Sequence, residues 1–239
     1  MKKIHFEHIN STSSYLKENY DKYDNLTFVS ADYQENGRGR NGRVWSSEEG
    51  ENLLFSILIN DEVLFNKTSD LSLSSAVCVY KCLKNFNIDD VSIKWPNDVY
   101  IKGKKISGIL LESVSCGKGI EALIIGVGIN VNSEKFTNDL INEPTSMCLE
   151  LGKKIDLDEI RQVIYNEFIV MINDIKNDKR NYLKVVRDNN YLKGKKVYAL
   201  IDNKRELVEV IDINDDNSLK VYVNSNYLNV YSGEVTFHV

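Results

Sequence analysis

Apolar and polar residues alternate along the first half of the chain in a way that predicts several β-strands. Alternation over four to eight residues is typical of a strand with one buried face, and a longer apolar run is typical of a strand buried on both faces. We expect strands at residues 26–31, 52–60, 91–95, 99–101, 106–111 and 120–131. Lys102-Gly103-Lys104 has the composition of a hairpin turn between the fourth and fifth of them.

Other segments have apolar residues at helical spacing. Thr68 or Ser69 is a candidate N-cap for a helix with Leu71 and Cys78 on its apolar side. We expect helices in the hydroxyl-rich segment after residue 9, from residue 68 or 69, over 157–175 and over about 178–189. Neighbouring strands with helices elsewhere predict an α+β fold with a mostly antiparallel sheet.

The pattern of apolar and polar residues changes at about residue 190. Short alternating segments follow one another, separated by turns rich in Asn, Asp and Gly, at 195–201, 206–213, 218–223, 226–231 and 235–239. Five short strands in so few residues are typical of a small barrel. We therefore expect two domains, at residues 1–190 and 191–239.

The composition is that of an ordinary globular protein with an acidic balance. The 239 residues are 42% hydrophobic and carry a formal net charge of −5, which argues against nucleic-acid binding through bulk positive charge. The sequence has no run of about eighteen apolar residues and no N-terminal signal peptide. The four cysteines contain no Cys-x-x-Cys pair and the three histidines lack metal-ligand spacing. We expect a cytoplasmic protein with no membrane association and no protein metal site.

The most distinctive segment is residues 37–45, which read Gly-Arg-Gly-Arg-Asn-Gly-Arg-Val-Trp. Its glycines allow tight turns and a close approach of the backbone to a ligand. Arg38, Arg40 and Arg43 add permanent positive charge and planar donors, and Trp45 adds an aromatic face. Such a loop suits an anionic ligand with phosphate or carboxylate groups, and a solvated surface turn is the plainer alternative.

Two common nucleotide motifs also match this loop, and the rest of the sequence argues against both. Gly37-x-Gly39-x-x-Gly42 fits the dinucleotide fingerprint, but that motif needs a helix directly after its glycines, whereas residues 52–59 predict a strand. A kinase would carry His-Arg-Asp and Asp-Phe-Gly motifs, and neither occurs in the sequence.

Three further clusters have a functional and a plain structural interpretation. Lys94-Trp-Pro-Asn-Asp98 is either a rigid corner that directs its polar side chains or a common turn. Lys104–Glu112 places Gly108 inside a strand, which often marks a close ligand approach, although its lysines also suit a solvated turn. Gly126-Val-Gly-Ile-Asn-Val131 predicts either a cavity wall with Asn130 as its polar group or tight backbone packing.

In this order and spacing the four clusters resemble the biotin protein ligases, which attach biotin to carboxylase carrier domains. The resemblance runs from about residue 4 to Ser232-Gly-Glu-Val235, and includes Ser-Thr-Ser at 11–13 and Tyr33-Gln34. It implies a catalytic domain related to class II aminoacyl-tRNA synthetases, followed by an SH3-like barrel. Because the sequence starts directly at that catalytic part, we expect no DNA-binding module and no repressor function.

The resemblance also implies a reaction in two steps. Biotin and ATP give biotinyl-5′-AMP and pyrophosphate, and a lysine of a biotin carboxyl carrier domain then attacks the mixed anhydride to form an amide. Fixed cations are needed because an anionic carboxylate has to attack an anionic phosphate. Mg²⁺ is expected with ATP, held by phosphates and water. A monomer and a homodimer both stay open.

Residue roles follow from the same resemblance. The catalytic residues are expected to be Lys105, Arg40 and Asp98, of which Asp98 would orient the carrier lysine. Biotin is expected to contact Ser11, Thr12, Ser13, Gln34, Gly37, Arg38, Gly39, Arg40, Lys105 and Gly108. ATP is expected to contact Arg40, Arg43, Trp45, Lys94, Asn97 and Asn130. The loop is expected to order on ligand binding and to shield the adenylate from water.

Two departures and two competing functions stay open. Asn41 stands where relatives often have a basic residue, and His238 stands where some have an arginine near the nucleotide, so the part of the barrel in ATP binding is undecided. A lipoate ligase or octanoyltransferase shares the fold, but its usual Arg-Arg-x-Ser-Gly-Gly-Gly signature is missing from this sequence. A non-catalytic biotin-binding protein would keep the pocket but lose Lys105, Asp98 or the arginine loop, and all three are present.

Overall fold

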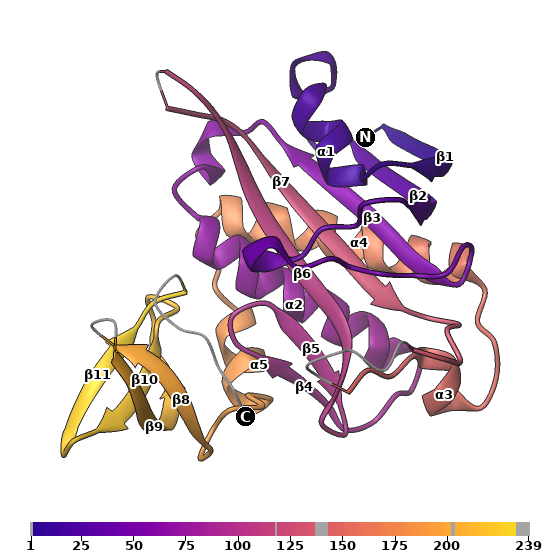
Figure 1. Cartoon of the computed structure of the whole chain (residues 1–239). Coiled ribbons are helices and arrows are strands. Elements are labelled where there is room, and N and C mark those ends of the chain that lie inside the picture. Colours follow the sequence, from indigo (N-terminus) through magenta and orange to yellow (C-terminus); the bar gives the residue numbers. More distant parts are fainter. Residues whose placement is uncertain (1, 118, 137–142, 202–203, 233–239) are drawn as a thin grey trace.

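The computed structural model describes residues 2–117, 119–136, 143–201 and 204–232. Within these residues one sheet has seven strands (Figure 1), in the spatial order β1 (Lys3–Ile9), β2 (Phe28–Gln34), β3 (Asn52–Ile59), β7 (Gly119–Asn130), β6 (Lys104–Cys116), β5 (Asp98–Ile101) and β4 (Val91–Lys94). Only β1 and β2 run parallel, and the other neighbours are antiparallel. The predicted α+β fold with a mostly antiparallel sheet is confirmed.

A smaller antiparallel sheet follows near the C-terminus. It has the order β11 (Asn226–Val230), β10 (Leu219–Val223), β9 (Lys204–Ile213) and β8 (Lys196–Ile201). These are four of the five short strands expected after residue 190. The fifth, at 235–239, lies outside the described residues, so the SH3-like barrel and the division at residue 190 stay predictions.

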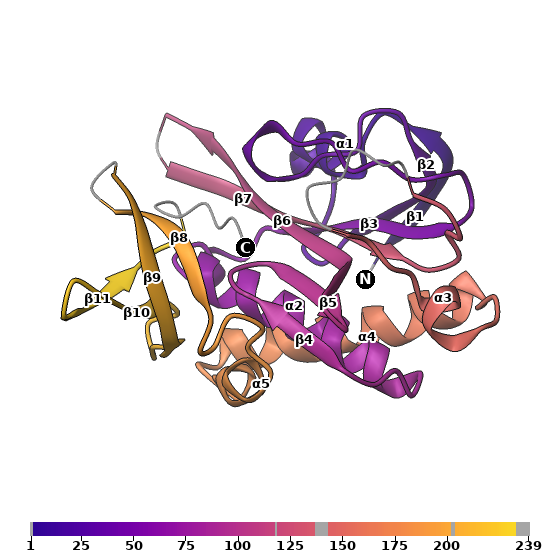
Figure 2. The same cartoon turned by 60° about the horizontal axis from the view of Figure 1, so that its bottom comes forward.

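The helices lie on both faces of the large sheet (Figure 2). Helices α2 (Thr68–Asn85), α4 (Leu157–Lys176) and α5 (Tyr182–Asp188) are on one side, and α1 (Thr12–Glu18) is on the other. The expected helices are all present. One detail was wrong: α2 begins after Lys67 as its N-cap residue, so neither Thr68 nor Ser69 caps it. Strand β1 and the short helix α3 (Met147–Leu151) were not predicted.

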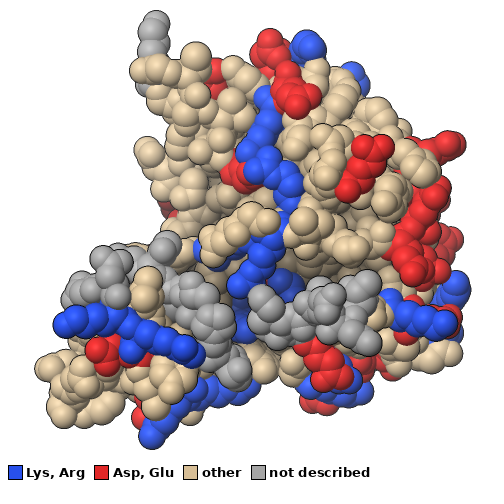
Figure 3. Space-filling view, viewed as in Figure 1, with Lys and Arg blue, Asp and Glu red and all other residues tan. Residues whose placement is uncertain are grey.

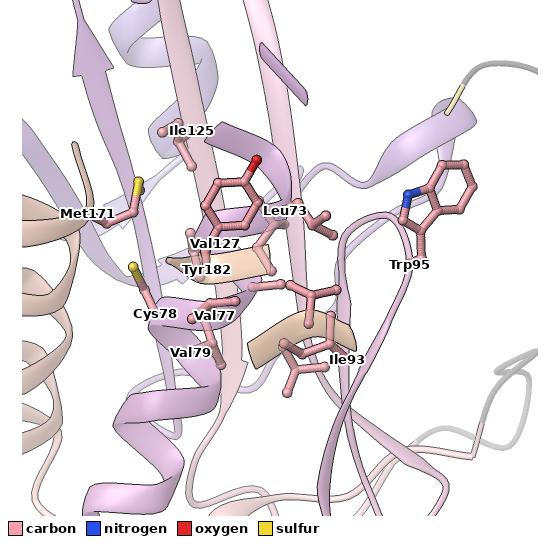
Figure 4. Packing of buried hydrophobic residues seen from close by; sticks show 14 of the residues in the cluster. Leu73, Val77, Cys78, Val79, Ile93, Trp95, Ile125, Val127, Met171 and Tyr182 are labelled. Carbon is pink, nitrogen blue, oxygen red and sulfur yellow. The ribbon is translucent and has the colours of Figure 1, made fainter. Parts of the chain in front are cut away.

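The larger core lies between the sheet and helices α2 and α4. Figure 4 shows Val77 of α2, Ile125 and Val127 of β7 and Met171 of α4 in this space. Burial of such apolar area is the main stabilising contribution to the fold. None of the helices in the described part of the chain is both long and apolar enough to cross a membrane.

The opposite face of the sheet has a much smaller apolar cluster. Leu16 of α1 packs there with the buried side chains of Val29, Leu58, Ala122 and Ile124. This cluster covers one end of the face only. The middle of the face carries glycines and polar residues instead, and there the candidate site lies.

Candidate functional site

A cavity of about 420 Å³ opens on one face of the large sheet, the face on which α1 and the loop at residues 37–45 lie. Its walls come from segments far apart in the sequence: the start of α1, the loop, the β4–β5 corner and strands β6 and β7. A cavity of this size with a few convergent polar groups is typical of a small-molecule site.

A β-bulge decides which residues of β6 face this cavity. Asp98 pairs with Gly108, but two residues further along β5, Tyr100 pairs with Lys105 instead of Ile106. Regular alternation would point residues 105 and 108 to opposite faces of the sheet, because side chains alternate with a period of two. The extra residue in the bulge returns Lys105 to the face of Gly108, as bulges near active sites often do.

Lys105 is held in place from several sides. Its Nζ lies 2.8 Å from Asp98 Oδ1, and the two side chains are 23% and 18% exposed. Its backbone N–H donates to Glu143 O, and its carbonyl accepts from Thr145 N–H. Nζ is also 5.8 Å from the centroid of the Trp45 ring. A half-buried ammonium fixed in this way suits the stabilisation of negative charge that develops in the cavity.

Two glycines provide the room for Trp45. Gly108 of β6 and Gly128 of β7 are cross-strand neighbours. A Cβ built on Gly128 would lie 2.5 Å from Trp45 Cε2, and one on Gly108 would lie 3.0 Å from Trp45 Cζ3. The indole therefore lies directly on bare backbone, and a larger residue at either position would displace it.

A chain of hydrogen bonds lines the α1 end of the cavity. Ser13 Oγ and Ser56 Oγ are 2.8 Å apart, and Ser56 Oγ is 2.7 Å from Thr12 Oγ1. Thr12 donates to Gln34 Oε1 from its backbone N–H at 2.8 Å and from its hydroxyl at 3.0 Å. Ser11 is the N-cap residue of α1 and accepts from Ser14 N–H. These contacts hold short polar side chains in fixed orientations at the cavity wall.

The loop forms a small hairpin that reaches across the cavity. Gly39 N–H donates to Arg43 O, and Trp45 N–H donates to Gly37 O. Arg40 Nη1 donates to Asn97 Oδ1 at 2.9 Å, and Nη2 donates to the carbonyl of Ser232 at 2.6 Å. Burial lowers the pKa of the Arg40 guanidinium, and the charge of Asp98 opposes that change. Arg40 therefore connects the loop with the β4–β5 corner and with the chain that follows β11.

The β4–β5 corner contributes a buried lysine. Lys94 is 8% exposed, and its Nζ donates to Tyr100 Oη at 3.2 Å. Burial lowers the pKa of Lys94, as do the like charges of Lys105, Lys195 and Arg43, while Asp98 raises it. Bringing an anion to this position would relieve the cost of a buried cation among like charges.

The charge of the cavity is strongly one-sided. Among the described residues that line it, the cations are Arg38, Arg40, Arg43, Lys94 and Lys105, and the acid is Asp98. Figure 3 shows Lys and Arg side chains in a column down this face of the molecule. Low-dielectric walls with one sign of charge raise the local concentration of a ligand of the opposite sign. The described part of the chain has no group of three or more His, Cys, Asp or Glu placed to hold a metal ion.

Nearly all residues singled out from the sequence meet at this cavity. Those that line it are Ser11, Thr12, Ser13, Gln34, Arg38, Gly39, Arg40, Arg43, Trp45, Lys94, Asn97, Asp98, Lys105, Gly108 and Asn130. Gly37 does not line it: it is buried at the start of the loop, where a Cβ would lie 2.2 Å from Trp45 O. Asn41 also lines the cavity, and His238 lies outside the described residues.

Sequence reasoning missed residues whose part depends on tertiary contacts. Ser56 joins Thr12 to Ser13, yet inside an apolar strand it carries no local signal. Phe136 and Pro144 line the cavity from a segment without a recognisable motif. Asn130 was expected to hold the nucleotide, and in the structure its Nδ2 donates to Thr145 O, which fixes the side chain at the cavity wall.

Comparisons with known proteins agree on one family. A model described as the biotin/lipoate A/B protein ligase family matches residues 5–130. The bifunctional ligase/repressor BirA of Bacillus subtilis is 32% identical over 212 residues, which are 87% of this chain and 65% of that protein. The biotin--[acetyl-CoA-carboxylase] ligase of Paracoccus denitrificans is 31% identical over 137 residues, which are 55% of this chain and 57% of that protein.

A solved structure extends this similarity to the whole fold. Biotin protein ligase from Aquifex aeolicus, in complex with biotin and ATP, superposes with a TM-score of 0.88 at 27% sequence identity. The superposition covers 99% of this chain and 98% of that one. The present chain spans less than two thirds of the length of the two curated relatives named above.

Proposed function

Because this chain belongs to the biotin/lipoate A/B protein ligase family, we propose that it is an ATP-dependent biotin protein ligase. One observation carries the proposal: Arg40 of the loop and Lys105 of β6 line the same cavity, beside the hydrogen-bonded chain of α1. An adenylating enzyme needs this combination of a polar ligand pocket and cations around a reacting carboxylate.

In the first step a carboxylate oxygen of biotin forms a bond to the α-phosphorus of ATP. The bond from that phosphorus to the bridging oxygen breaks, and pyrophosphate leaves with its electron pair. Lys105 and Arg40 would offset the charge that builds on the phosphate oxygens, while Lys94 and Arg43 would attract the triphosphate. Asp98 holds Lys105 by the 2.8 Å ion pair. Biotinyl-5′-AMP is the product.

In the second step a lysine amine of a biotin carboxyl carrier domain attacks the acyl carbon of the mixed anhydride. The C–N bond forms, the C–O bond to the phosphate breaks, AMP leaves and the amine loses a proton. Asp98 is the carboxylate in the cavity wall that would orient the incoming amine. The protein supplies position and charge in both steps, with no covalent enzyme intermediate.

The polar network of α1 suits the ureido ring of biotin. Gln34 Oε1 already accepts two hydrogen bonds from Thr12, so its Nε2 is the part of the amide left to donate to a ligand carbonyl. Ser13 and Thr12 have their hydroxyls oriented by Ser56. Together these groups offer both donors and acceptors, as a cyclic urea requires.

Mg²⁺ would enter together with ATP. Asp98 is the acid among the described lining residues and is already paired with Lys105, so the phosphates and water would supply most of the ligands. The absence of a repressor function stays a prediction.

Transfer of labelled biotin to a purified carrier domain tests the proposal. We expect label on the carrier with biotin and MgATP present, no label when ATP is omitted, and a large loss with Lys105→Met. Lys104→Met is the matched control, because Lys104 pairs with Glu143 instead of Asp98. Transfer of lipoate or octanoate in place of biotin would favour the related acyl-transfer function, and binding of biotin without transfer would favour a binding protein.

A further inference from the structure

Glu112 joins two parts of the site that the sequence keeps far apart. Glu112 Oε1 lies 2.5 Å from Lys17 Nζ of α1 and 3.1 Å from Arg38 Nη2 of the loop. The carboxylate is 14% exposed, against 25% for Lys17 and 46% for Arg38. A carboxylate shielded to this degree interacts more strongly with its partners than a fully exposed one.

The position of Glu112 on β6 places it at the edge of the cavity. Gly108 and Leu110 line the cavity, and Glu112 follows at the same two-residue spacing on that face. Its other oxygen, Oε2, is buried and has no hydrogen-bond partner among the described residues. The carboxylate is therefore kept in place chiefly by two cations, one from each side of the cavity.

Each cation belongs to an element that shapes the pocket. Lys17 lies one helical turn after Ser13, so its ion pair fixes the side of α1 that carries the hydrogen-bonded chain. Arg38 opens the loop hairpin and forms a bridge to Val44, while Arg40 ties the tip of the same hairpin to Asn97. The loop is thus attached at three points, through Arg38 to Glu112, through Arg40 to Asn97 and through Trp45, which lies on Gly108 and Gly128.

We propose that Glu112 is a positioning residue that anchors the loop over the cavity through Arg38 and couples it to α1. Glu112 offsets one of the two positive charges of Lys17 and Arg38, so these three side chains together keep a net charge of +1 beside the charges of Arg40 and Arg43. Removing the anchor leaves the loop with the contacts of Arg40 and Trp45, which lowers the fraction of molecules with the loop in place.

Hydrogen–deuterium exchange of the loop amides tests the anchor. Glu112→Gln keeps the shape of the side chain and removes its charge, and we expect the amides of Gly39 and Trp45 to exchange about fivefold faster, as expected for loss of a partly shielded ion pair. Glu121→Gln is the matched control. Glu121 lies on β7, the strand paired with β6, and it accepts a hydrogen bond from Tyr20 instead of a loop residue. The loop amides of Glu121→Gln should exchange at the same rate as those of the parent protein.

Two further measurements separate anchoring from general stability. Arg38→Gln should speed exchange as much as Glu112→Gln, and the double variant should add nothing, because both changes remove the same pair. A purely structural role would instead speed exchange throughout β6 and β7 and lower the melting temperature. Exchange in Glu112→Gln within twofold of the parent, or additive effects in the double variant, would overturn the proposal.

The effect on ligand binding rests on the proposed function. The biotin dissociation constant of Glu112→Gln should rise in inverse proportion to the fraction of molecules with the loop in place, because only those molecules bind fully. Unchanged affinity with a released loop would refute the positioning role. If the parent protein binds no biotin, the proposed function fails, while the exchange data still decide whether Glu112 anchors the loop.

Discussion

Gly126→Ala should weaken biotin binding through a single methyl group. Gly126 lies in the middle of β7, paired with Ser56 of β3 and Leu110 of β6, so its backbone is held from both sides. A Cβ at this position would lie 2.6 Å from Ser13 Oγ. An ordinary contact needs at least 3.4 Å, and the difference of 3.4 − 2.6 = 0.8 Å has to come from Ser13.

The magnitude follows from three effects. Overpacking of this kind costs about 1–3 kcal/mol, and loss of the 2.8 Å Ser13–Ser56 hydrogen bond adds about 1 kcal/mol. Replacing a strand glycine by alanine returns about 0.5–1 kcal/mol of conformational entropy. The steric loss therefore exceeds the gain, and the free energy of unfolding should fall by about 1–3 kcal/mol. A misplaced Ser13 hydroxyl should cost a further ligand hydrogen bond, which corresponds to an affinity about tenfold lower.

Isothermal titration with biotin measures this change, and Gly128→Ala on the same strand is the comparison variant. A methyl group on Gly128 meets Trp45 instead of Ser13, so this variant should lower biotin affinity by releasing the loop, whereas Gly126→Ala should lower it with the exchange of the loop amides unchanged. Thermal unfolding shows that both variants are folded at the assay temperature. Parental biotin affinity in Gly126→Ala would refute the assignment of this end of the cavity to biotin.

Three further predictions concern the loop, the lysine and a buried thiol. Lys105→Met should slow adenylate formation by about 10²–10³-fold in a single-turnover assay, and a loss below tenfold would contradict its role. Arg40→Gly removes the contacts to Asn97 and Ser232, so biotinyl-AMP should dissociate about tenfold faster in a filter assay, which corresponds to about 1.4 kcal/mol. An unchanged dissociation rate would refute the role of Arg40 in retaining the adenylate. Burial raises the pKa of Cys82 from 9.0 to about 12. The unfolded chain therefore releases this proton first, and stability should fall as the pH rises above 9, by about 1 kcal/mol between pH 9 and 10. Urea unfolding of Cys82→Ala should show a shallower decline, and an identical slope would contradict the assignment.

Much of the fold could be predicted because the evidence for it is local. Alternation and apolar runs located strands β2 to β7, although β6 continues five residues beyond its predicted end at residue 111, and helical spacing located α2 and α4. Turn chemistry predicted the hairpin at Lys102 and Gly103, which both have positive φ. Strand β1 was missed although Ile4 and Phe6 alternate with polar residues, because most of its positions are exposed and the apolar signal is weak.

The sequence by itself also identified most of the polar and charged groups that line the cavity, since fixed charges and glycines are visible without a fold. Only the tertiary structure decided how they act together. The bulge at Ile106 turns Lys105 toward the face of Gly108, and no residue type in β6 predicts this bulge. Ser56 and Glu112 obtain their partners from segments more than forty residues away. The physical reason is that residue type sets what a side chain can donate, accept or neutralise, whereas strand register and packing set which other side chain it meets.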